Sequence, residues 1–143
     1  KLVYVEGRRH EDRGEWKEAE VSFRRALALH RTTTVYNHLG LSLSRQGRHA
    51  RAAVYFIEAL RINPWNPKVL ENFSETLSKK PSLVQEAAFW RLADSIPEKV
   101  VVYNNLGSLL GQRGSKEAAK AFFEKAIEAD PAFEPARHNL TLV

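Results

Sequence analysis

The sequence repeats itself with a period of 33 or 34 residues, and this period constrains the architecture more than any other feature. Residues that favour turns recur at Gly14, Gly47, Pro81 and Gly114, which lie 33, 34 and 33 residues apart. Three further registers keep the same step: one is aromatic, one consists of alanines and one of small residues. Their members are Phe23, Phe56, Trp90 and Phe123, then Ala26, Ala59, Ala93 and Ala126, and then Gly7, Gly40, Ser74 and Gly107. The sequence therefore predicts four similar structural units in a row.

Each unit carries apolar residues at the spacing of an amphipathic helix, i, i+3, i+4 and i+7. In the second unit one such run spans residues 36–43 and another spans 52–60. Proline follows the second helical run at Pro64, Pro97 and Pro131, where it ends a helix because it cannot donate the backbone hydrogen bond. No strand pattern competes. Each unit is therefore predicted to be a helix, a tight turn and a second, antiparallel helix.

The second unit resembles the tetratricopeptide repeat. The residues that carry the resemblance are Tyr36-x-x-Leu39-Gly40-x-x-Leu43, followed by Gly47, Ala52, Phe56, Ala59 and Pro64, and residues 100–133 match equally well. This resemblance implies an all-α solenoid of antiparallel helix pairs that winds into a right-handed superhelix. We expect a single domain over residues 1–143. Its expected units are about 1–32, 33–66, 67–99 and 100–133, with a terminal helix over 134–143.

Two units depart from the pattern. In the first unit, Glu6 and His10 occupy the registers where the second unit has Leu39 and Leu43, which predicts a weakly packed N-terminal end. In the third unit, Pro81 stands in the turn between the two helices. We therefore expect the second helix of the third unit to sit slightly off register.

Composition argues against catalysis and metal binding. The chain has no cysteine, and its five histidines never take the His-Glu-x-x-His spacing of zinc proteases. A glycine-rich phosphate loop is also missing from the sequence. We therefore predict that the chain is not an enzyme and that it uses no catalytic residue, no metal and no cofactor.

No apolar run reaches the roughly 18 residues of a membrane span, and the first residues lack the layout of a signal peptide. The chain starts with Lys1 and contains no methionine, so we expect it to be a fragment of a longer protein. The sequence leaves the compartment open, with the cytoplasm as the default.

The net charge of +5 comes entirely from the first half. Residues 1–66 contain twelve Lys and Arg against seven Asp and Glu, whereas residues 67–143 contain ten of each. Because arginine grips carboxylates and phosphates in a planar fork, an acidic partner is expected. Nucleic acid is disfavoured, because Arg45, Arg48 and Arg51 have few uncommitted aromatic side chains nearby on which bases could stack.

The resemblance implies that the first helices line a concave groove, so their uncommitted polar side chains are the candidate peptide-binding residues. These are Arg8, Asn37, Arg45, Lys68, Asn72, Asn104, Asn105 and Asn139. Asn72, Asn105 and Asn139 share one register, which resembles the asparagine ladder of the tetratricopeptide part of O-GlcNAc transferase. Such amides could hydrogen-bond the backbone of an extended peptide. The alternative is that they pack between helices and bind no ligand.

The predicted function is that of an adaptor or scaffold that binds a peptide segment of a partner protein in the groove. Arg8 and Asn37 also fall at positions that resemble the carboxylate clamp of co-chaperones, but Tyr4 stands where the clamp has a lysine, which disfavours that mode. Two alternatives stay open. The array is the substrate-docking region of a larger enzyme such as a protein glycosyltransferase, or it self-assembles through its two ends.

Overall fold

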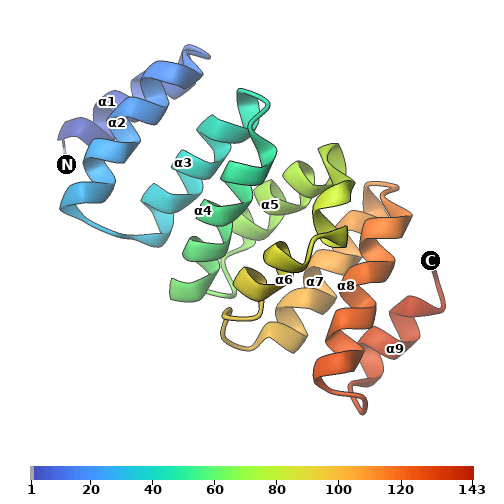
Figure 1. The fold of residues 1–143 in the computed structure, drawn as a ribbon. Coiled ribbons are helices and arrows are strands. Elements are labelled where there is room, and N and C mark those ends of the chain that lie inside the picture. Colours follow the sequence, from blue (N-terminus) through green and yellow to red (C-terminus); the bar gives the residue numbers. More distant parts are fainter. Residues whose placement is uncertain (1) are drawn as a thin grey trace.

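The computed structural model describes residues 2–143 and contains, over that range, nine α-helices, one short 3₁₀ helix and no strand. The α-helices are α1 (Leu2–Asp12), α2 (Trp16–Leu29), α3 (Thr33–Arg45), α4 (His49–Ile62), α5 (Pro67–Lys79), α6 (Ala87–Ala93), α7 (Lys99–Gln112), α8 (Lys116–Ala129) and α9 (Glu134–Leu140). The 3₁₀ helix, η1, covers Pro81–Gln85. Helix pairs follow one another from one end of the molecule to the other, with α9 last (Figure 1). The predicted all-α solenoid is confirmed.

The chain forms two layers of helices with the core between them. In Figure 1, α2, α4, α6 and α8 lie in front of α1, α3, α5 and α7. Phe23, Phe56 and Phe123 take the same place in three units, and each is at most 2% exposed. Each ring comes from the second helix of its unit and packs on the glycine of the first helix.

Glycine is required at two registers for different reasons. In Gly40 and Gly107 a Cβ atom would lie 2.7 Å from the Phe56 ring and 2.5 Å from the Phe123 ring, so only glycine lets these helices approach so closely. Gly47 has a positive φ of 80°, and the equivalent glycines of the first and fourth units have the same conformation. Such left-handed residues end a helix, and glycine adopts the conformation without strain.

The third unit departs further from the pattern than its sequence predicts. Pro81 replaces the turn glycine, and because its ring holds φ near −65°, it cannot adopt the left-handed conformation. The chain instead forms η1, and α6 begins only at Ala87. The second helix of this unit is therefore seven residues long, whereas α2, α4 and α8 have fourteen each.

An aromatic cluster stabilises the shortened α6. Phe89 and Trp90 pack edge to face with ring centroids 5.0 Å apart. Trp90 also lies 4.9 Å from Phe122 of α8 and 5.5 Å from Tyr103 of α7. The Tyr103 hydroxyl donates a 2.6 Å hydrogen bond to Asp94, the residue that follows α6. Aromatic pairs of this kind add about 0.5–1.5 kcal/mol each beyond the area they bury. Side chains of the fourth unit thus pack around Trp90 and hold the C-terminal end of α6.

Candidate functional site

A polar groove of about 600 Å³ lies between α1, α3 and α5, on the side of the molecule formed by the first helices. It is lined by Tyr4, Arg8, Thr34, Asn37, His38, Asn66, Pro67, Lys68, Glu71 and Asn72. Four of the eight predicted peptide-binding residues lie in it. These are Arg8 from α1, Asn37 from α3, and Lys68 and Asn72 from α5. The other four, Arg45, Asn104, Asn105 and Asn139, lie outside this groove.

Asn37 and Asn72 form a pair that links successive units. The Asn72 amide nitrogen, Nδ2, donates a 3.1 Å hydrogen bond to Oδ1 of Asn37. Asn37 is only 7% exposed, and its own Nδ2 donates to no protein atom in the described part of the chain. Every fully buried side-chain nitrogen or oxygen there has a hydrogen-bond partner, so Nδ2 of Asn37 must reach solvent. The N–H groups of Asn37 therefore face the groove.

Asn139 and Asn104 repeat this arrangement two units later, with a 3.0 Å bond from Nδ2 of Asn139 to Oδ1 of Asn104. Asn72 and Asn139 of the ladder register thus connect neighbouring first helices. The binding of a peptide backbone by this register stays a prediction. Asn105 is half-buried, and the residue that would pair with it in the preceding unit is Glu71.

At this position, where the asparagine pair is missing, Arg113 binds Glu71 instead. The sequence had not singled out Arg113. Its guanidinium donates to the Glu71 carboxylate, to the Glu71 carbonyl and, at 3.1 Å from Nε, to the Ser74 hydroxyl. The serine in a glycine register was the available sequence signal, because its hydroxyl oxygen can accept from a side chain of the next unit while its O–H donates to the Glu71 carbonyl. Arg113 itself does not line the groove, but it holds Glu71, which does.

The cations of the groove differ in how freely they can meet a ligand. Nε of Arg8 lies 2.8 Å from the Glu11 carboxylate, whose other oxygen lies 2.8 Å from Nδ1 of His38. Arg8 is therefore partly neutralised although its side chain is 46% exposed. Lys68 is exposed and makes no ion pair within residues 2–143. It is the cation of the groove that is most available to an acidic ligand.

Arg45 lies away from Arg8 and the groove. It forms an ion pair with Glu75 at 3.3 Å, and its guanidinium lies 5.6 Å from the centre of the Trp16 ring. The structure therefore does not bring Arg8 and Arg45 together around one acidic side chain.

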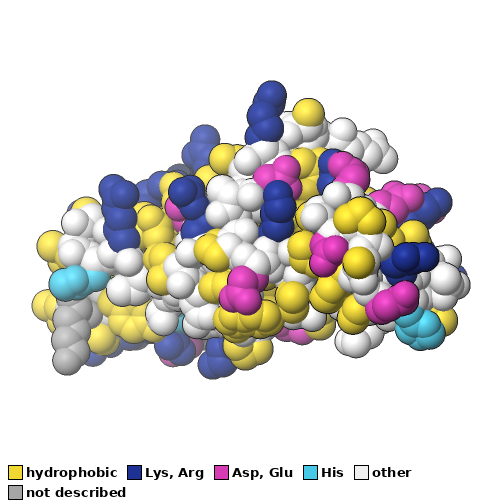
Figure 2. All heavy atoms as spheres, turned by 90° about the horizontal axis from the view of Figure 1, so that it is seen from below, with side chains coloured by type: hydrophobic (Ala, Val, Ile, Leu, Met, Phe, Trp, Pro, Cys, Tyr) yellow, Lys and Arg dark blue, Asp and Glu magenta, His cyan; other side chains and the backbone are white. Residues whose placement is uncertain are grey.

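Two arginines of the N-terminal half bind Glu20, which is 8% exposed and accepts from Arg24 at 2.9 Å and from Arg48 at 3.1 Å. Burial raises the pKa of Glu20, but hydrogen bonds from Gln46 and Arg24 and the charges of Arg24 and Arg48 outweigh it. The pKa of Glu20 is therefore below its ordinary value. On the face drawn in Figure 2, Lys and Arg dominate over the N-terminal units, while Asp and Glu gather over the middle and the C-terminal units.

Other kinds of site find no support in the part of the chain that the structure covers. Within it, no group of three or more His, Asp or Glu side chains could hold a metal ion. None of its helices is long and apolar enough to cross a membrane. Self-association through the array ends stays a prediction; at the N-terminal end, α1 exposes Leu2 and Val5.

Comparison with protein families agrees with the repeat pattern. A tetratricopeptide repeat family model matches residues 4–67, and a second model of the same description matches residues 100–133. Together the two matches cover more than half of the 143 residues.

Similar curated proteins include the human and mouse proteins named protein O-mannosyl-transferase TMTC1. The human protein is 31% identical over 110 residues, which cover 73% of this chain and 12% of that protein. The mouse protein is 25% identical over 133 residues, covering 89% of this chain and 14% of that protein. The chain therefore spans only a small part of the length of these relatives.

Among solved structures, the crystal structure of YrrB, described as a TPR protein with an unusual peptide-binding site, is similar to this chain. The TM-score is 0.53 at 20% sequence identity, and the alignment covers 95% of this chain and 71% of YrrB. At this identity the likeness shows the shared fold alone.

Proposed function

Because the chain belongs to the tetratricopeptide repeat family, whose fold serves as a scaffold for protein–protein interaction, we propose that it captures a peptide segment of a partner protein in the groove between α1, α3 and α5. In this proposal it acts as an adaptor, by binding alone, and it carries out no reaction. The observation that carries the proposal is the donor-rich lining of the groove.

The chemistry of the preferred ligand follows from the hydrogen-bonding groups that the groove leaves free. Oδ1 of Asn37 is occupied by Asn72, so the pair offers mainly N–H donors to a ligand. Arg8 and Lys68 add charged donors on the α1 and α5 sides of the groove. A segment that presents backbone carbonyls and one or more carboxylates satisfies these donors, and charge-assisted hydrogen bonds of this kind are the stronger ones. The preferred ligand is therefore an extended segment with acidic side chains.

The groove also limits the length of the segment. It spans three first helices, and packed helices lie about 8–10 Å apart, so it is about 20 Å long. An extended chain advances about 3.3 Å per residue, so about six residues fill it. On the α5 side the lining includes Glu71, which is held by Arg113.

A charge reversal at Lys68 tests the proposal. Random seven-residue peptides would first be selected on the protein by display, and the selected peptides would then be measured by fluorescence polarisation. Lys17→Glu is a matched control for Lys68→Glu, because each lysine is exposed, is the second residue of its helix and makes no ion pair among the described residues. We expect acidic peptides to be selected and their affinity to fall at least fivefold in the Lys68→Glu variant, with no change in the control.

The affinity should also weaken as salt is raised from 50 to 500 mM, because exposed charges are screened. Equal affinity of the two variants for the selected peptides would contradict the proposed groove. Selection of peptides without acidic residues would contradict the ligand class.

A second candidate function is that the array is a docking region for acceptor proteins in a protein glycosyltransferase. The observation in its favour is the 31% identity to a protein named as an O-mannosyl-transferase. The test is to introduce Lys68→Glu and Lys17→Glu into a longer protein that contains this chain, and to compare mannose transfer to acceptor proteins. Docking through the groove requires that transfer falls only in the Lys68→Glu protein; equal transfer in both would exclude this role of the groove.

A further inference from the structure

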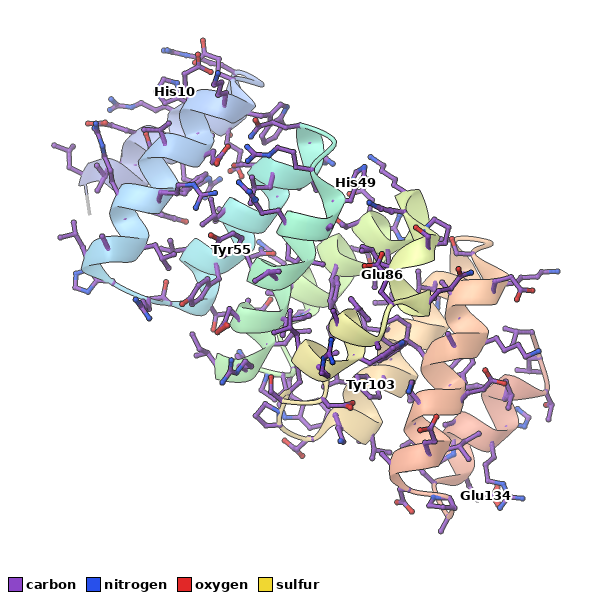
Figure 3. All side chains as sticks on the ribbon, in the orientation of Figure 1. His10, His49, Tyr55, Glu86, Tyr103 and Glu134 are labelled. Atoms are coloured by element: carbon purple, nitrogen blue, oxygen red, sulfur yellow. The ribbon has the colours of Figure 1, made fainter. Side chains whose placement is uncertain are left out.

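The break in the third unit leaves two depressions on the side of the molecule formed by the second helices, opposite the groove. The larger, of about 530 Å³, lies between η1 and α8. The smaller, of about 140 Å³, lies between α4 on one side and η1 and α6 on the other. Glu86, labelled in Figure 3, connects η1 to α6 and lines the smaller depression. The two depressions therefore flank the same 3₁₀ helix.

The smaller depression is apolar. Its floor is made by buried side chains that include Ile57, Leu83 and Phe89, and its rim includes Val54 at 38% and Leu92 at 43% exposure. A cavity of about 150 Å³ accommodates a benzene ring, so this space takes one apolar side chain of a partner. Val54 and Leu92 thus extend the apolar lining of the hollow to the surface.

The larger depression is acidic on a basic protein. Glu117, Lys120 and Glu124 of α8 line it, and Glu86 lines its neighbour. None of these three carboxylates forms an ion pair within residues 2–143, although the whole chain has a net charge of +5. The charges that line the two depressions therefore amount to three carboxylates against one ammonium group.

From this combination we propose that the surface around η1 binds a second partner segment, distinct from the ligand of the groove, that carries an apolar anchor flanked by lysine or arginine. The apolar side chain enters the hollow between α4 and α6, and the basic side chains lie over Glu117 and Glu124. These two glutamates are seven residues apart on one helix, about 10 Å, and basic residues three positions apart in an extended segment have about the same spacing. Charge complementarity of this kind sets partner choice and association rate.

The test uses a fluorescein-labelled ten-residue peptide with one leucine between two pairs of lysines, and a matched peptide with glutamates in place of the lysines. Binding to the nitrogen-15-labelled protein would be followed by NMR, and affinity by fluorescence polarisation. We expect backbone amide shifts in α4, η1, α6 and α8 with the lysine peptide and none there with the glutamate peptide. This result is independent of the proposed groove function, whose ligand is acidic and whose shifts fall in α1, α3 and α5.

Three variants test the role of charge. Glu124→Gln should weaken binding of the lysine peptide at least threefold. Lys120→Gln removes the one positive charge of this surface, which repels the lysines of the peptide, and should strengthen binding. Glu18→Gln is the control, since Glu18 is an exposed carboxylate of α2 without an ion pair in the described residues, and it should change nothing. The proposal is overturned if the lysine peptide causes no shifts at 1 mM, if its shifts lie elsewhere, or if Glu124→Gln binds it like the parent.

Discussion

Two glycines of α7, Gly107 and Gly111, predict opposite effects of the same substitution. At Gly107 an added Cβ would lie 2.5 Å from the Phe123 ring, whereas at Gly111 its nearest neighbour would be a Val143 methyl at 3.9 Å. Both residues lie in the same helix, one turn apart. Replacing each by alanine therefore isolates the cost of close packing from the change in helix propensity.

The magnitude follows from two opposing effects. Alanine stabilises a helix by up to about 1 kcal/mol relative to glycine. Overpacking a core costs about 1–3 kcal/mol. The added Cβ would lie at least 1 Å closer than the best carbon–carbon separation of about 3.5–4.0 Å, which places the cost of Gly107→Ala at the upper end of that range. We expect Gly107→Ala to destabilise by about 2 kcal/mol and Gly111→Ala to stabilise by up to about 1 kcal/mol.

Urea unfolding followed by circular dichroism measures the change in unfolding free energy of each variant. In thermal unfolding, the melting temperatures of the two variants should differ by roughly 10 °C. Phe123→Leu combined with Gly107→Ala should recover part of the loss, because the two sites are coupled through one contact. The reasoning is refuted if Gly107→Ala is as stable as Gly111→Ala, or if Phe123→Leu and Gly107→Ala destabilise additively.

Three other predictions concern charge, hydrogen bonding and the broken helix. The lowered pKa of Glu20 adds stability that is present above its unfolded pKa and lost as pH falls through its folded pKa. In urea titrations, the difference in unfolding free energy between the parent and Glu20→Gln should therefore shrink as pH drops from 6 to 3. Asn139→Ala leaves Oδ1 of the 9%-exposed Asn104 without its donor and should cost about 1 kcal/mol of unfolding free energy; no change would mean that water replaces the bond. Pro81→Gly permits the positive φ of the other units, so NMR shifts should show helix before Ala87, and unchanged shifts there would contradict this.

The repeat registers were enough to predict the fold, because each small or aromatic position has one physical task. Glycine at residues 40 and 107 lies under a phenylalanine ring, and the period alone identifies both partners. The registers alone did not predict how far the third unit departs from the pattern of the other units. It depends on the sign of a backbone angle that proline cannot adopt, and on the aromatic side chains around Trp90 that compensate for the missing helix turns.

The candidate site was predicted only in part. Lys68 and Arg8 were found because exposed cations on a first helix have no packing task, and both line the groove. The pairing of Asn72 with Asn37 was not predicted, because it joins two different registers in neighbouring units. Arg113 was missed for a similar reason, since its partner lies 42 residues away in sequence and in another helix pair.

The shortened α6 has a consequence for the order in which the chain folds during synthesis. Its seven residues rest on Phe122 and Tyr103, which leave the ribosome after them. The first two units contain complete helix pairs and can pack as soon as they emerge, whereas Trp90 of α6 gains its ring partners only when α7 and α8 have been made. Translation at about 5–20 residues per second delays those partners by roughly two to seven seconds. During that interval Phe89 can already pack on Phe73 of α5, but Trp90 lacks its ring partners, so the third unit completes its packing later than the first two.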